Sequence, residues 1–296
     1  MGIDNAHYYG WQGELQSPRW ATLAIVRISL LQVLRRKLYW IVISLGMVQF
    51  LLFWVIIYVV TQFKLPGDFQ REMHNITGFS PKPDFGEENG YVTFMQNQSV
   101  VVMILLAFAG SLLVGSDFRL RALPFYLSRR IDRRHYIIGK LLSISALISL
   151  LTVVPAIALF IEYGMFTSST GYWRENWTML LSVLAYGAVM CASMSIMIVT
   201  LSAYLQRVAP IAITWCSGFA MLNRLSGYLK DATDNDYWQL IDPGRDIRLV
   251  GKLCFGAFQT AKDQWVAELA AMILVCFCAL CLVALVHRVR AVDIVE

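Results

Sequence analysis

Residue types that commonly carry out chemistry are sparse in this sequence and do not fall into catalytic spacings. The histidines lack the His-Glu-x-x-His spacing of a metalloprotease and are scattered along the chain: His7, His74, His135 and His287. Two Gly-Lys pairs, at 139–140 and 251–252, are each followed by leucine, whereas a phosphate-binding loop requires serine or threonine there. We therefore predict no catalytic residue, no metal site and no ATP hydrolysis in this chain, which is not expected to be an enzyme.

The cysteines indicate packing and not redox or metal chemistry. Five of the six lie inside apolar runs, and no pair stands in a polar loop with the spacing of zinc ligands. They are Cys191, Cys216, Cys254, Cys276, Cys278 and Cys281. An intramembrane serine protease is disfavoured as well, because no apolar run offers a histidine as the base that would activate a serine.

Composition places these residues in a polytopic membrane protein. Apolar residues make up 57% of the 296 residues and charged residues only 15%, against about 25% in an ordinary soluble domain. The mean hydropathy is +0.56, and a soluble domain of this length has too little interior to bury so much apolar surface. The formal charge is only +5, so nucleic acid is not an expected partner.

Apolar runs predict six membrane-spanning helices, since a helix needs about 20 mostly apolar residues to cross the hydrocarbon. The predicted spans are 38–60, 99–115, 141–161, 178–204, 209–222 and 267–286. The fifth is the shortest, and is either a short span or a re-entrant segment. The expected fold class is an all-α polytopic membrane protein with a single transmembrane domain, 1–296.

The distribution of basic residues indicates that both termini lie in the cytoplasm. Lys and Arg number 15 in the alternate segments that begin with the N-terminus and 10 in the segments between them, and short basic loops stay cytoplasmic. Segment 116–140 is then a cytoplasmic loop, whereas 61–98 and 223–266 are extracytoplasmic loops.

Residues 19–37 are predicted to form a helix that lies in the membrane interface. With helical periodicity, one face is apolar and contains Trp20, Leu23, Ala24, Leu30, Leu31, Leu34 and Leu38. The opposite face contains Thr22, Ser29, Gln32 and Arg36. This pattern is typical of an interfacial amphipathic helix. A plain cytoplasmic extension of the first span is the alternative.

The cytoplasmic loop at 116–140 combines seven basic residues with aromatic and aliphatic ones. Phe118, Phe125 and Tyr126 interleave with the arginines, and Pro124 divides the stretch into two short pieces. A loop that only contacted lipid headgroups would not need these apolar residues, so the composition favours docking on a soluble partner. The alternative is a solvated, positively charged loop.

The run Leu123 to Leu142, LPFYLSRRIDRRHYIIGKLL, resembles the loop after the second span in type-2 exporter permeases of the ABC transporter family. Residues that match the family's pattern are Leu127, Ser128, Arg129, Arg133, Tyr136, Gly139 and Lys140. Arg130 stands where the family usually has proline. The six predicted spans, the amphipathic N-terminal helix and the larger loop before the last span are also similar to that fold.

The resemblance implies a subunit of the plasma membrane (in bacteria, the inner membrane) that contacts lipids and pairs with a second copy or a homologue. Each permease would dock on a cytoplasmic ABC ATPase subunit that holds ATP and Mg, so this chain itself needs no cofactor. The implied coupling residues are Arg121, Leu123, Phe125, Tyr126, Leu127, Ser128, Arg129 and Arg130.

The resemblance also implies a substrate pathway at the interface between two permeases, lined by the second and fifth spans. Candidate pathway residues are Gly110, Ser111, Thr214, Ser217 and Gly218, for which ordinary small-residue helix packing is the alternative. The loop 223–266 would form an outer gate with Tyr228, Tyr237 and Trp238.

Two function classes follow from the sequence. The first is the membrane-spanning subunit of an ATP-driven exporter, whose uncharged path favours lipid-like or amphiphilic cargo. The alternative is a non-transporting membrane scaffold or assembly factor that recruits a cytoplasmic partner through the same loop. An intramembrane enzyme is a third class, disfavoured because no span carries a charged residue at its centre.

Overall fold

A computed structural model of the protein describes residues 18–63, 88–120, 133–166, 172–258 and 260–291. Of these residues 93% are helical and none lies in a strand, which confirms the predicted all-α fold class. Five runs in the described part are long and apolar enough to cross a membrane: Lys37–Gln62, Gly90–Arg119, Arg133–Phe166, Trp177–Leu205 and Ala261–Val289. The chain therefore fits a multi-pass membrane protein, and these runs contain every predicted span except 209–222.

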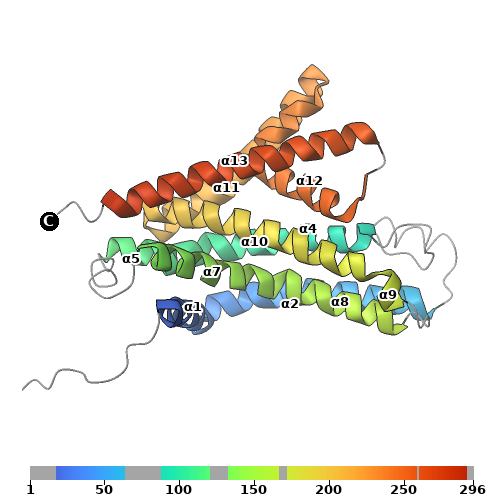
Figure 1. The fold of residues 1–296 in the computed structure, drawn as a ribbon, viewed down its shortest axis with the longest axis horizontal. Helices are drawn as coiled ribbons and strands as arrows, with labels where there is room; N and C mark the ends of the chain where they lie inside the picture. The colour runs from blue at the N-terminus through green and yellow to red at the C-terminus, as the bar shows by residue number, and fades with distance from the viewer. Residues whose placement is uncertain (1–17, 64–87, 121–132, 167–171, 259, 292–296) are drawn as a thin grey trace, which may run out of the picture.

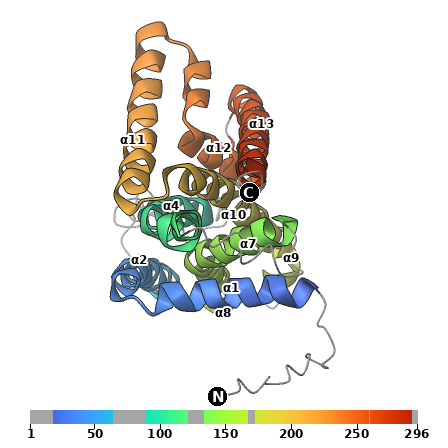
Figure 2. The ribbon, with the colours of Figure 1, turned by 90° about the vertical axis from the view of Figure 1, so that its left-hand side faces the viewer.

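The helices form three layers, which both views of the ribbon show (Figures 1 and 2). The middle layer contains α4 (Glu88–Gly110), α7 (Arg133–Leu151) and α10 (Trp177–Leu205). One outer layer contains α1 (Pro18–Leu34), α2 (Lys37–Gln62) and α8 (Val153–Phe166). The other contains α11 (Val208–Thr233), α12 (Pro243–Phe255) and α13 (Ala261–Ala291). The short helix α9 (Tyr172–Glu175) precedes α10.

The second and third apolar runs are longer than the predicted spans. α4 continues through a π-helical turn, η2 (Ser111–Gly115), into the short helix α5 (Ser116–Arg119). α7 and α8 are separated at Thr152, three residues before Pro155, which has no N–H for the helical hydrogen bond. Hydropathy marks only the apolar part of a helix, and these helices continue past it at both ends.

Helix α1 lies crosswise to the long helices at one end of the bundle (Figure 2). Of the side chains predicted for its apolar face, Trp20, Leu23 and Leu31 are exposed, whereas Leu30 and Leu34 pack against the core. Thr22 and Ser29, predicted to lie on the opposite polar face, are buried where α1 packs on α7. Small hydroxyl side chains permit this close helix contact, so the face is used for packing.

Helix α10 is the centre of the bundle, and glycines lie at its contacts with α4, α8 and α12. A Cβ added to Gly110 would lie 2.6 Å from Ile198 and from Ser202 of α10, and one added to Gly187 would lie 2.3 Å from Val153. Glycine is therefore required at these contacts, because any side chain would push the helices apart.

The fifth predicted span, 209–222, lies within a longer helix. It is the first half of α11, a continuous helix of 26 residues. Its second half carries Arg224, Lys230 and Asp231, and α11 is for that reason not among the five apolar runs.

The segment 223–266, predicted as a loop, is mostly helical and folds back into the bundle. After α11 it forms the 3-10 helix η3 (Asp236–Ile241) and then α12. Ile247 of α12 lines one pocket together with Met103 and Met194, and Met194 is the eighteenth of the 29 residues of α10. The beginning of α12 is therefore level with the middle of α10, so the re-entering element is η3–α12.

Gly251 provides a test of this re-entry. A Cβ at Gly251 would lie 2.5 Å from the ring of Tyr186 in α10, so Gly251→Ala is expected to lower the free energy of unfolding by about 1–3 kcal/mol through overpacking. The measurement is thermal unfolding of the detergent-purified protein. Gly218→Ala is the matched control, because a Cβ there meets nothing within 4 Å. Equal stability of the two variants would contradict the packing of α12 on α10.

Candidate functional site

A buried ion pair joins α5 to α7, and both ends of the segment predicted as the loop 116–140 are therefore helical, over 116–119 and from 133 onward. The Lys140 Nζ lies 2.8 Å from Asp117 Oδ2 and donates a hydrogen bond to the Leu113 carbonyl oxygen at 2.6 Å. The Tyr136 hydroxyl donates to the same Asp117 oxygen at 2.9 Å. The side chains of Lys140 and Asp117 are only 5% and 14% exposed. We call Asp117, Tyr136 and Lys140 the clamp, since they hold α5 and α7 together.

The π-helical turn η2 connects the clamp to the rest of the bundle. Leu113, whose carbonyl oxygen accepts from Lys140, belongs to this turn, and π-helical turns are wider than α-helical ones and frequent at functional sites. On another side, a Cβ at Gly115 would lie 2.8 Å from the Gln206 carbonyl oxygen. Gln206 links α10 to α11 and has a left-handed backbone, with φ of 59°. A displacement of η2 would therefore move both α7 and the connection between α10 and α11.

Three residues of the family-like pattern share one side of α7 and have separate contacts. Tyr136, Gly139 and Lys140 follow the i, i+3, i+4 spacing of one helix face. Tyr136 and Lys140 hold Asp117, whereas a Cβ at Gly139 would lie 3.1 Å from Ile25 of α1. The pattern thus positions α5 and α1 against the same two turns of α7.

The predicted coupling residues themselves lie outside the described residues. They are Arg121, Leu123, Phe125, Tyr126, Leu127, Ser128, Arg129 and Arg130. The described residues next to this segment are Leu120, which follows α5, and Arg133, which begins α7.

The predicted pathway residues divide into two groups. Gly110 and Ser111 are buried against α10. Thr214 and Gly218 of α11 instead line an apolar groove of about 400 Å³ between α10, α11 and α13, and Ser217 is exposed. The fold does not bring the five residues together, because the first pair faces the centre of the bundle and the others lie on α11.

The η3–α12 segment, which lies within the predicted loop 223–266, brings two buried carboxylates, Asp242 and Asp246, into the bundle. The Asp242 Oδ1 accepts a hydrogen bond from the Gly244 N–H at 2.9 Å and so caps α12. Asp246 is 2% exposed, and its Oδ1 accepts no hydrogen bond within the described part of the chain. Burial and the nearby Asp242 carboxylate raise the pKa of Asp246 to about 8. The run Asp242-Pro243-Gly244, typical of a helix start, was the available signal.

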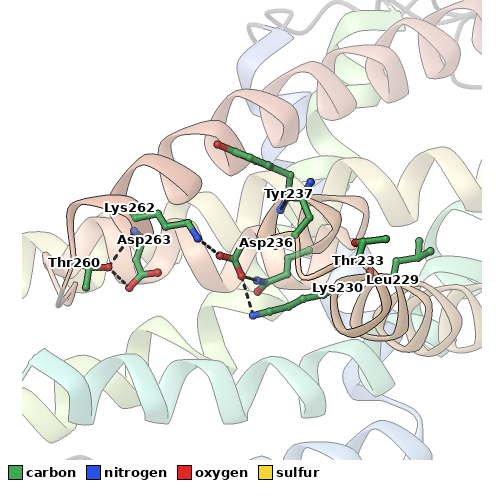
Figure 3. A network of polar contacts seen from close by, with 10 residues as sticks. Leu229, Lys230, Thr233, Asp236, Tyr237, Thr260, Lys262 and Asp263 are labelled. Carbon is green, nitrogen blue, oxygen red and sulfur yellow. Dashed lines mark hydrogen bonds and ion pairs between the residues drawn. The ribbon is translucent and has the colours of Figure 1, made fainter.

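An exposed network fixes η3 between α11 and α13 (Figure 3). The Asp236 carboxylate accepts from Lys262 at 2.6 Å and lies 3.1 Å from Lys230. Hydrogen bonds from these two ammonium groups lower the pKa of Asp236. Exposed pairs of this kind contribute about 0–1 kcal/mol each, so the network sets position more than stability.

The clamp can be tested by breaking it from one side. Lys140→Met would leave the Asp117 carboxylate buried without its cation, and is expected to lower the free energy of unfolding by about 3–5 kcal/mol. The double variant D117N/K140M should recover most of this loss, because no buried charge remains. Thermal unfolding in detergent measures both. Lys230→Met, which removes one member of the exposed network, should change stability by about 1 kcal/mol or less; an equally small effect of K140M would contradict the clamp.

The raised pKa of Asp246 predicts that the free energy of unfolding depends on pH. The folded state retains a proton that the unfolded chain releases above the ordinary pKa of 3.8, so this residue makes the protein less stable as pH rises toward about 8. Asp246→Asn removes that proton equilibrium. The free energy of unfolding of D246N minus that of wild type is expected to rise by about 1–3 kcal/mol from pH 5 to pH 9. Thermal unfolding at each pH measures this difference. Asp231→Asn, at an exposed position of α11, is the control; parallel curves for D246N and wild type would refute the assignment.

These contacts join α5, α7 and η2 at the two ends of the segment 121–132. Within the described residues, no three His, Cys, Asp or Glu side chains come together as metal ligands would. Comparison of the sequence with models of known protein families and with curated proteins found no match.

Proposed function

We propose that this chain is the membrane-spanning permease subunit of an ABC exporter, which moves its substrate across the membrane with ATP hydrolysed by a separate cytoplasmic subunit. The observation that supports this best is the clamp. A loop that receives force must be joined rigidly to the spans, and a buried, fully partnered ion pair at its base supplies such a joint.

The clamp also suggests how the movement would spread. A push on 121–132 would displace α5 and α7 together, because Lys140 links both. α1 would follow through the contact between Gly139 and Ile25, and α11 through the contact between Gly115 and Gln206. A movement of this segment would thus reach α11, which contains the fifth predicted span, through contacts between helices alone.

The proposal includes α11 as a sixth crossing, with both termini in the cytoplasm of the plasma membrane (in bacteria, the inner membrane). The excess of basic residues on the N-terminal side supports this orientation. The crosswise position of α1 and its exposed apolar side chains, Trp20 and Leu23 among them, support a helix lying in the interface.

Exposed polar residues on α11 support pairing with a second copy or a homologue. Thr214 and Ser217 are exposed on this helix and are three residues apart, so they lie on one side of it. Polar and charged groups at membrane depth face protein or water and not lipid. The second permease would cover this stripe and form the pathway with it.

The coupling assignment is tested by co-purification with the ATPase subunit. The double variants R129E/R130E and F125A/Y126A are expected to weaken the association at least about tenfold, since apolar and arginine side chains dominate docking surfaces. Arg174→Glu, an exposed arginine of α9 outside the loop, is the charge-reversal control. Unchanged association of both loop variants would reject the coupling role. Association without substrate-stimulated ATP turnover in the reconstituted complex would indicate the scaffold function instead.

A further inference from the structure

A continuous cleft lies between α11 on one side and η3 and α12 on the other. Its deepest pocket, of about 300 Å³, shares Asn223 and Arg248 with a middle pocket of about 380 Å³. The middle pocket shares Gln239 and Lys252 with an outer pocket of about 400 Å³. Because neighbouring pockets have walls in common, we treat the three as one space and call it the outer cleft.

The deep end of the outer cleft is apolar. Val100, Met103, Met194, Phe219 and Ile247 line it. Since Met194 is near the middle of α10, this end reaches well into the bundle. Apolar walls and flexible methionine side chains suit a hydrocarbon chain more than a polar ligand.

The middle of the outer cleft is strongly basic. Arg245, Arg248 and Lys252 follow the spacing i, i+3, i+7 and lie on one face of α12. Arg245 reaches across to α11, where its guanidinium nitrogen lies 3.6 Å from the position of a Cβ at Gly227. Arg224 of α11 lines the adjoining deep pocket. Four cationic side chains from two opposite walls therefore converge on one space.

The protein balances this charge only in part. Asp242 is the one carboxylate that lines the deep and middle pockets among the described residues. One of its oxygens is occupied by the Gly244 N–H, and the other is 3.8 Å from Arg248. Arg224, Arg245 and Lys252 form no ion pair with the described residues. The fork of an arginine guanidinium group binds phosphate or carboxylate oxygens with two parallel hydrogen bonds.

We propose that the outer cleft binds an anionic amphiphile, with its phosphate or carboxylate headgroup among Arg224, Arg245, Arg248 and Lys252 and its apolar chain against Met103 and Phe219. The interpretation of this ligand as the exporter's cargo rests on the proposed function. Binding itself requires no ATPase.

The experiment measures binding to the purified full chain in a neutral detergent. A short-chain phosphatidic acid, a phosphatidylcholine with the same chains and inorganic phosphate are titrated separately, and the shift of the unfolding temperature gives the affinity. Phosphatidic acid is expected to bind at least tenfold more tightly than either of the others. Equal binding of phosphatidylcholine would show a merely apolar groove, and equal binding of inorganic phosphate a simple anion site; either result would overturn the proposal.

Variants place the binding in the outer cleft. R245Q/K252Q should weaken phosphatidic acid binding at least tenfold, and Gly227→Leu, which fills the space beside Arg245 without changing charge, should weaken it as well. The control R119Q/R207Q removes two exposed arginines outside the cleft and should leave affinity within about twofold. An equal loss in that control would indicate non-specific attraction and reject the site. The binding assay contains no ATPase, so an absence of phosphatidic acid binding would not contradict the coupling proposal. Likewise, a failure to co-purify with the ATPase would not contradict the binding site.

Discussion

Close contact of helices around α10 is the constraint on which the rest of the structure depends. Within lipid, helices gain little by burying apolar surface against one another, so association depends on tight packing at small residues. Gly110, Gly187 and Gly251 each lie where a Cβ would come within 2.6 Å of a neighbouring side chain. These three contacts attach α4, α8 and α12 to α10. The layers seen in Figures 1 and 2 follow from them.

The clamp adds a polar joint to this apolar bundle. An ammonium group is costly to bury unless its charge and its donors are satisfied, and Lys140 finds both a carboxylate and a carbonyl oxygen. Asp117 is equally satisfied, by Lys140 and Tyr136. A fully partnered pair has one favourable geometry, so α5 and α7 are fixed relative to each other where their loop begins and ends. That rigidity is what gives the loop its proposed role.

Charge is distributed unevenly over the η3–α12 segment, and this gives the two sides of α12 different properties. The carboxylates of Asp242 and Asp246 are buried, whereas Arg245, Arg248 and Lys252 face the outer cleft. Asp242 caps α12, and the basic side lines the outer cleft.

The sequence by itself determined the all-helical membrane class, five of the apolar runs and a separate N-terminal helix. Each of these follows from local hydropathy, because a span must satisfy its own backbone hydrogen bonds over the thickness of the bilayer. The coupling residues from Arg121 to Arg130 stay a prediction. Only the tertiary structure decided that Lys140 pairs with Asp117, that Thr22 and Ser29 face α7, that α11 extends to Thr233 and that α12 re-enters the bundle. These features depend on which distant segments meet, and periodicity along one segment carries no information about the partner it will contact.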